Sequence, residues 1–357
     1  MNKLKSLWFA LLIGCALAAC GEDDAAGSDA GSDGGTDTDT DTDADTDSDA
    51  DADSGVDGGA GGLPEISFDA YHSYEEVIGY LLGVAAAEPE IASYSVIGPT
   101  VEGRDLGVLV IDATGVDDPP AVFLNGAHHG DEHPSTEALL AFVDHVLRNR
   151  DDADVADALD HFAVYVLPIV NPDGFVVPSR MNADGVDVNR DYSWPTADAG
   201  VGFDEPETLA MKQVIDDVGF YGAAAYHAGS AEVIWPWCYT GDPTDDDATL
   251  ISIGTATAQA MGFDRYMQSY DDYPTTGEFI DYAYWATGTL AFTVEVYDEK
   301  HPDASLLQGI VDPVVDGTIV YLEQLAALYD GAKLRGGAPS AGVGHVVRLD
   351  ASGGKLE

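Results

Sequence analysis

The fold of this chain is decided by residues 121–132, which read AVFLNGAHHGDE. The first half, Ala121 to Gly126, is a short and mainly apolar run, which is typical of a strand buried on both faces of a sheet. His129 and Glu132 follow that strand after a glycine-rich turn. We expect this turn to let both side chains face one point.

Further apolar segments alternate with amphipathic ones along the chain. Strands are predicted at 93–97, 106–111, 163–170, 223–226 and 290–296. Helices are predicted at 73–87, 137–147, 206–218, 248–261 and 303–330. Buried strands that alternate with helices predict an α/β fold. We expect a three-layer sandwich, in which helices flank a central twisted sheet that is mixed but largely parallel.

Polar side chains follow the buried strands at their carboxyl ends. Besides His129 and Glu132, Asn171 follows the next strand, His227 ends another, and Glu295 lies near the end of a fourth. Parallel α/β sheets bind ligands at this edge, so we expect one shared site. Two histidines and a glutamate are a common ligand set for catalytic zinc, with a fourth position open to water. The sequence therefore predicts one Zn²⁺ per chain.

Several short motifs occur in an order that is typical of one family. They are Glu102-Gly103-Arg104, His129-Gly130-Asp131-Glu132, Asn171-Pro172-Asp173-Gly174-Phe175, Gly185-Val186-Asp187-Val188-Asn189-Arg190 and Phe292-Thr293-Val294-Glu295. Each motif alone is weak. The ordered set covers most of residues 70–330 and resembles the zinc carboxypeptidase family of the carboxypeptidase A type. The resemblance implies an enzyme that hydrolyses peptides.

The resemblance also implies roles for the metal-binding and catalytic side chains. The zinc ligands would be His129, Glu132 and His227. Asp187 matches the carboxylate that orients the first histidine, and such outer partners fix the tautomer. Glu295 matches the general base, which takes a proton from water and passes it to the leaving amine. Arg180 matches the arginine that stabilises the oxyanion.

Other matched residues would hold the substrate. Asn189 and Arg190 match the pair that binds the terminal carboxylate of a peptide, a task that suits the two parallel donors of an arginine. Tyr273 matches the mobile tyrosine that closes over the substrate. These residues imply a peptide substrate that presents a free carboxyl end.

One position is expected to set the preference for the terminal residue. The spacing of Tyr273, Gly277 and Asp281 places Ile280 where family members determine the depth and polarity of the side-chain pocket. An aliphatic residue there favours apolar or aromatic termini over Lys or Arg, because a buried cation would lack a partner. Glu278 is an alternative, since a small shift of the loop would bring its carboxylate inward.

The sequence leaves alternatives to a zinc metallocarboxypeptidase. Gly130-Asp131-Glu132 and the short span between Arg190 and Glu205 favour a γ-D-glutamyl-diaminopimelate amidase of the same superfamily, which cleaves cell-wall peptides. Trp235-Pro236-Trp237 and residues 273–282 favour a carboxypeptidase. A third alternative is an inactive lipoprotein that binds a surface. Loss of a ligand or of the base would support it, and none is lost.

The N-terminus carries a targeting segment. Lys3 and Lys5 precede an apolar run that ends Leu17-Ala18-Ala19-Cys20, which resembles a bacterial lipoprotein signal. We expect residues 1–20 to be the signal and Cys20 to be lipidated. An ordinary cleaved leader is the alternative. With a lipid on Cys20, the protein would be anchored to a membrane of the cell envelope, either in the periplasm or exposed at the surface.

Charge and composition divide the rest of the chain. Residues 21–63 include alternating Asp with Thr, Ala or Ser, which predicts a disordered acidic linker, although such a repeat could also bind calcium. We assign 64–335 to the catalytic domain and 336–357 to a glycine-rich tail.

The formal charge of −51 disfavours nucleic acid as a partner. We expect a monomer.

Overall fold

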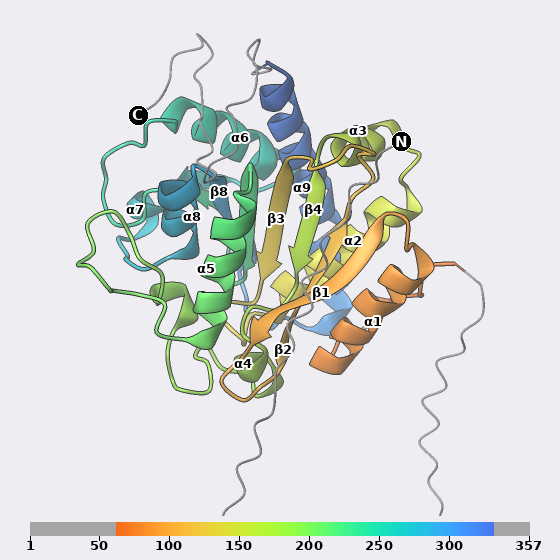
Figure 1. Cartoon of the computed structure of the whole chain (residues 1–357), viewed down its shortest axis with the longest axis horizontal. Helices are drawn as coiled ribbons and strands as arrows, with labels where there is room; N and C mark the ends of the chain where they lie inside the picture. The colour runs from red at the N-terminus through yellow and green to blue at the C-terminus, as the bar shows by residue number, and fades with distance from the viewer. Residues whose placement is uncertain (1–61, 332–357) are drawn as a thin grey trace, which may run out of the picture. The chain divides into compact units, whose positions relative to one another are not determined.

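The structure is a computed structural model that describes residues 62–331. This part of the chain forms one eight-stranded sheet in the order β1-β2-β4-β3-β5-β8-β6-β7 (Figure 1). The strands are β1 (Ala92–Pro99), β2 (Asp105–Ile111), β3 (Ala121–Gly126), β4 (Ala163–Leu167), β5 (Gly222–His227), β6 (Ser230–Trp235), β7 (Arg265–Gln268) and β8 (Leu290–Tyr297).

The centre of the sheet is parallel, and an antiparallel pair joins it to each flank, β2–β4 on one side and β6–β8 on the other. Strands β4, β3, β5 and β8 run in one direction, and β2 and β6 join them in the opposite direction. The register pairs His227 at the end of β5 with Glu295 on β8. The carboxyl ends of the central strands therefore meet at one edge. The prediction of a mixed, largely parallel sheet is confirmed.

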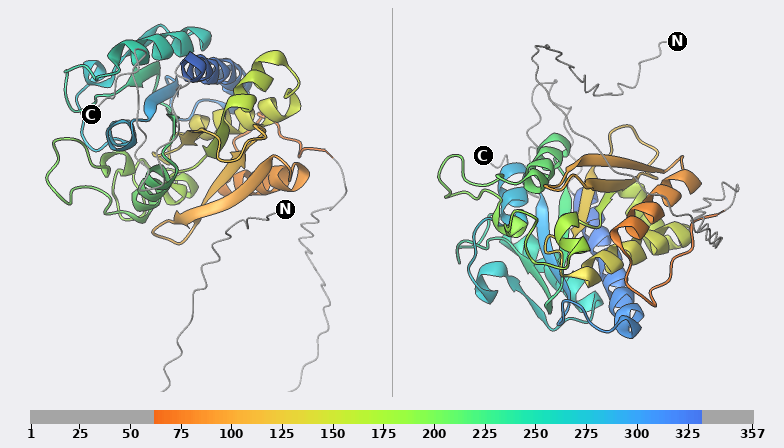
Figure 2. Two further views of the ribbon diagram at one scale, coloured as in Figure 1. Left: turned by 45° about the horizontal axis from the view of Figure 1, so that its top comes forward. Right: turned by 90° about the horizontal axis from the view of Figure 1, so that it is seen from below.

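Helices cover both faces of the sheet (Figures 1 and 2). One face packs against α1 (Tyr74–Ala87), α2 (His133–Arg148), α3 (Ala153–His161), α6 (Asp247–Ala260) and α9 (Leu307–Gly331). The other packs against α5 (Pro206–Val218) and α8 (Phe279–Thr287). Shorter helical segments are α4 (Pro172–Val176), η1 (Val188–Arg190), α7 (Ser269–Asp272) and η2 (Ala304–Leu306).

Strand β3 shows how the sequence specifies these layers. Val122 and Leu124 pack into the cluster that includes α2 and α9, whereas Phe123 packs into the cluster that includes α5 and α8. Phe123 stacks on Phe220 with ring centroids 4.8 Å apart. Because both faces are covered, every residue of β3 is buried, and the strand is apolar without alternation.

Some element boundaries differ from the predictions. Helix α2 begins at His133 rather than at 137, because Pro134 is compatible with a first helical turn, where its missing N–H costs nothing. Strand β4 ends at Leu167 rather than at 170, because Pro168 cannot donate to the ladder. The elements that were not predicted are all short, and short elements give a weak periodic signal; they are α3, α4, α7, α8, η1, η2, β6 and β7.

Three predicted segments concern the ends of the chain. The signal segment with Cys20, nearly all of the acidic linker and the tail at 336–357 lie outside the described residues. Between residues 62 and 331, no helix is both long and apolar enough to cross a membrane.

Candidate active site

Three side chains meet at the carboxyl edge of the sheet. His129 and Glu132 lie between β3 and α2, and His227 is the last residue of β5. All three are buried, and their ligand atoms lie within 4.8 Å of one another. Nδ1 of His129 lies 3.3 Å from Nδ1 of His227. The Glu132 carboxylate lies 2.8 Å and 2.9 Å from these two nitrogens.

The spacing of these atoms fits a zinc ion. Nitrogen ligands lie ~2.0–2.1 Å from tetrahedral zinc, which places two of them about 3.3 Å apart. The two Nδ1 atoms have this separation. The two Nδ1 atoms and the Glu132 carboxylate converge on one point, as the ligands of a shared cation do. The three residues predicted as ligands are thus brought together as a metal group.

A tight turn presents His129 and Glu132 after β3. Ala127 has a positive φ of 48°, a strained conformation for a residue with a side chain. The Ser135 hydroxyl stabilises the turn, because it accepts a bond from the Ala127 N–H at 3.1 Å and donates to the Glu132 carbonyl at 2.6 Å. A Cβ atom on Gly130 would lie 1.9 Å from a backbone atom of Gly174, so this position requires glycine.

Asp187 holds the first histidine from behind the metal group. Its Oδ1 lies 3.1 Å from Nε2 of His129, which leaves Nδ1 of that ring directed at Glu132 and His227. Burial alone would raise the pKa of Asp187, but its hydrogen bond with His129 and the charges of His129 and Arg180 hold that pKa well below its usual range. An ionised Asp187 fixes the ring in the orientation that a metal requires.

Arg180 extends from Asp187 toward the metal group. Its Nε donates to Asp187 Oδ2 at 2.9 Å, and its Nη2 lies 2.8 Å from the same oxygen. These contacts hold the guanidinium so that Nη1 lies 3.2 Å from His129 Nδ1. Asp187 therefore holds the Nε and Nη2 edge of the guanidinium, and Nη1 lies beside the metal group.

Glu295 faces the metal group from the adjacent strand. It is half-buried on β8, opposite His227 in the register. Its Oε2 is enclosed and has no hydrogen-bond partner among the described residues. Burial raises the pKa of Glu295, and the negative charges of Glu132 and Glu232 raise it further. A cation bound at the metal group would oppose this shift.

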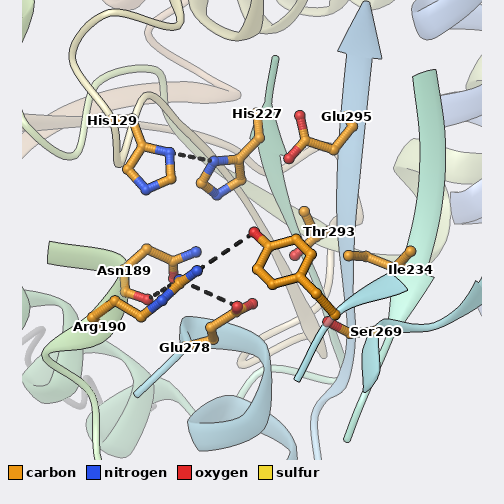
Figure 3. Close-up of a pocket in the computed structure, with 10 residues that line it drawn as sticks. His129, Asn189, Arg190, His227, Ile234, Ser269, Glu278, Thr293 and Glu295 are labelled. Atoms are coloured by element: carbon orange, nitrogen blue, oxygen red, sulfur yellow. Dashed lines mark hydrogen bonds and ion pairs between the residues drawn. The ribbon is translucent and has the colours of Figure 1, made fainter. Parts of the chain in front are cut away.

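Asn189 and Arg190 lie across the cavity from the metal group (Figure 3). The Asn189 Oδ1 accepts a bond from the Phe279 N–H at 3.0 Å, so its amide NH₂ remains for other partners. Arg190 donates through Nη2 to the Tyr273 hydroxyl at 3.5 Å. Its Nη1 lies 3.2 Å from Oε1 of Glu278.

Groups from both sides line one open cavity (Figure 3). The lining residues are His129, Asn189, Arg190, His227, Ile234, Ser269, Tyr273, Glu278, Thr293 and Glu295. Ile280 is not among them. It is 1 % exposed and packs in the apolar cluster under α8. Its predicted influence on the terminal residue stays a prediction, whereas Glu278, the alternative, lines the cavity directly.

Two side chains near the edge differ from expectation. Asn171 does not reach the metal group, because its Oδ1 caps α4 by accepting from the Gly174 N–H at 2.9 Å. Lys300, which was not predicted as a site residue, places Nζ 3.0 Å from Glu132 Oε1 and 3.3 Å from Asp131. No local signal identifies it, because Lys300 lies far along the chain from the Gly130-Asp131-Glu132 motif that it contacts.

The fold and this site define an α/β metalloprotein with its metal group at the carboxyl edge of a mixed sheet. The chain belongs to the zinc carboxypeptidase family, which matches residues 77–315. Zinc is the cofactor of that family, and the His129, Glu132 and His227 group fits it.

Individual relatives agree with this assignment. The chain is 29 % identical over 236 residues to carboxypeptidase SOL1 of Arabidopsis thaliana, covering 60 % of this chain and 48 % of that protein. It is 26 % identical over 226 residues to carboxypeptidase B of Astacus astacus, covering 55 % and 74 %. The chain therefore spans about half the length of the first relative and three quarters of the second.

A solved structure supports the fold. Carboxypeptidase A from Helicoverpa armigera superposes with a TM-score of 0.68 at 23 % identity, covering 74 % of this chain and 76 % of that one. At this level of identity, the likeness concerns the arrangement of helices and strands.

Proposed function

We propose that this protein is a zinc metallocarboxypeptidase that hydrolyses the C-terminal peptide bond of peptides. One observation carries the proposal: a single cavity has the metal group and Glu295 on one side and Arg190 with Asn189 on the other. A peptide held by its terminal carboxylate at Arg190 would direct its last peptide bond toward the metal group. Hydrolysis would then release one amino acid at a time.

The metal ligands proposed are His129, Glu132 and His227, with Asp187 orienting His129. When bound there, zinc supplies a Lewis acid that lowers the pKa of water and polarises a carbonyl. Glu295 takes one proton from the attacking water and passes it to the nitrogen of the leaving amine, so the carboxylate is regenerated after each turnover. Its enclosed Oε2, which has no hydrogen-bond partner within residues 62–331, supports this assignment.

The arginines serve two different charges. Arg180, held by Asp187, donates to the negative charge that develops on the carbonyl oxygen as water attacks. Arg190 and the Asn189 amide bind the substrate carboxylate, which is negative throughout the reaction. Tyr273 is 54 % exposed at the mouth of the cavity and would close over the bound residue.

The test is hydrolysis by the purified, zinc-loaded chain of peptides with varied C-terminal residues, assayed beside a γ-D-glutamyl-diaminopimelate muropeptide. Release of single C-terminal amino acids supports the proposal. Cleavage of the muropeptide alone would identify the amidase alternative. A zinc-loaded chain that cleaves neither would agree with the inactive surface-binding alternative.

We also propose that Cys20 carries the lipid that anchors the protein to a membrane of the cell envelope, with residues 21–63 as a tether and a monomeric enzyme outside the cytoplasm. The sequence of the N-terminal segment supports this. Metabolic labelling with a tagged fatty acid should mark the protein, and the Cys20→Ala variant should lose the label. Equal labelling of both would place the lipid elsewhere.

A further inference from the structure

A lysine that does not line the cavity contacts the metal group. Nζ of Lys300 lies 3.0 Å from Oε1 of Glu132, a proposed zinc ligand that is 2 % exposed. The same Nζ lies 3.3 Å from each carboxylate oxygen of Asp131. An exposed Lys–Asp pair alone would contribute little. Because Lys300 also contacts a buried ligand, its charge acts on the metal site itself.

The segment that carries Lys300 is fixed by contacts on both sides. A Cβ atom added to Gly229 would lie 3.7 Å from Cγ of Lys300, so the stem of the lysine packs along this glycine. The Gly229 N–H donates to the Tyr297 carbonyl at 2.8 Å. On the other side, Tyr71 stacks on His301 with ring centroids 4.2 Å apart. A fixed segment therefore presents the ammonium group to the metal group.

The two oxygens of Glu132 have different outer partners. Oε2 accepts a bond from the Ala228 N–H at 3.2 Å, whereas Oε1 faces the charged Lys300. The same two oxygens lie 2.9 Å from Nδ1 of His227 and 2.8 Å from Nδ1 of His129. A cation bound at the metal group would share the Glu132 carboxylate with Lys300, and two positive charges beside one carboxylate repel each other.

We propose, on the basis of the zinc carboxypeptidase function above, that Lys300 is a positioning residue that acts through Glu132: it weakens zinc binding and makes bound zinc a stronger Lewis acid. A carboxylate that shares its charge with an ammonium group donates less of that charge to a metal, so the Lewis acidity of the metal rises. Asp131 opposes this effect, because it neutralises part of the charge of Lys300. Asp131 and Lys300 together thus adjust zinc affinity against turnover.

The sharpest test measures zinc affinity and turnover in the same variant. Lys300→Met replaces the ammonium group with an uncharged thioether. We expect zinc affinity, measured by competition with a chelator, to rise by ~10-fold and kcat at saturating zinc to fall by a similar factor, the lower end of the usual effect of an outer partner. Loss of a merely structural contact would lower both quantities. Lys300→Arg, which keeps the charge, should preserve both.

Two further variants complete the comparison. Asp131→Asn leaves the full charge of Lys300 to act on Glu132, so zinc affinity should fall instead of rise. Lys212→Met is the matched control, because Lys212 pairs with Asp216 on α5 and does not line the cavity. That variant should leave both zinc affinity and kcat unchanged.

The outcomes separate this inference from the proposed function. Zinc affinity is measured without a substrate, so tighter binding in Lys300→Met supports the inference even if no peptide is cleaved. Unchanged or weaker zinc binding, or tighter binding with unchanged kcat, would overturn it and leave the carboxypeptidase function intact. So would a raised KM that depends on the charge of the residue before the scissile bond, because Lys300 would then bind substrate. If Lys300→Met does not fold, Asp131→Asn decides, and zinc affinity that is unchanged or higher overturns the inference.

Discussion

The two sides of the cavity are built in different ways. The metal side takes its residues from strand ends and from the turn after β3, and outer contacts such as Asp187 to His129 hold them. The opposite side takes Arg190 from a 3-10 segment and Glu278 from a loop. The first arrangement is set by the sheet and the second by contacts between loops. We therefore expect the metal side to control chemistry and the other side to control which substrate binds.

The largest effect should come from removing a ligand on the metal side. His227→Ala should lose zinc and all measurable turnover, because two protein ligands hold zinc far less tightly than three. Zinc content by elemental analysis and peptide hydrolysis are the readouts. The matched control is His128→Gln: His128 is buried and stacks on His227, but its Nε2 lies 3.0 Å from the Tyr192 hydroxyl instead of in the metal group. Zinc-free protein with full activity would end the proposal.

A change to the base should separate chemistry from metal binding. Glu295→Gln should keep its zinc and lower kcat by ~10²–10⁴-fold, the usual contribution of general acid–base catalysis. Glu299→Gln is the control, since Glu299 follows the same strand but is exposed and does not line the cavity. Turnover in Glu295→Gln close to that of the unmodified enzyme would assign the proton transfer to another group.

A change on the opposite side should affect binding. Arg190→Ala should raise KM for free-acid peptides by ~10–10²-fold with zinc content unchanged, because hydrogen bonds to a charged group are worth about 1.5–3 kcal/mol. Arg190→Ala also leaves Glu278 without its cationic partner. The double variant R190A/E278Q removes that unpaired charge and so isolates the loss of substrate binding. Peptides with an amidated C-terminus should already be poor substrates of the unmodified enzyme. Equal rates for acid and amide would contradict the division between the two sides.

The smallest effect should come from the outer contact of the metal side. Asp187→Asn keeps the size of the side chain but removes the charge that orients His129, so zinc affinity should fall by ~10–100-fold. Competition with a zinc chelator measures this. Unchanged affinity together with a raised KM would show that Asp187 serves the substrate side, through Arg180, rather than the metal.

The difference between the two sides also explains what the sequence could predict. Strands β3, β5 and β8 are continuous apolar runs, so the positions of His129, His227 and Glu295 at their ends followed from local pattern. Family motifs then added the arginines. The layered fold was predictable for the same reason, because each buried strand is a continuous apolar run in the sequence.

Loop residues could not be placed in this way. The spacing argument favoured Ile280, but α8 begins at Phe279, and the first turn of that helix directs Ile280 into the core while Glu278 faces the cavity. Lys300 follows β8 and approaches Glu132 only through the fold. Such contacts depend on where a helix begins and on the path of the loop over the fold. The local hydrophobic periodicity of the sequence determines neither.

The pairing of His227 with Glu295 across β5 and β8 has a mechanical consequence. Neighbouring strands in any sheet lie about 4.8 Å apart, a spacing set by backbone hydrogen bonds and not by side chains. The spacing of the strands thus sets the distance between the metal ligand His227 and the proposed base Glu295. Loops around the cavity can lengthen, shorten or change charge while that distance stays constant. Substrate preference can therefore change without any change in the spacing of the catalytic groups.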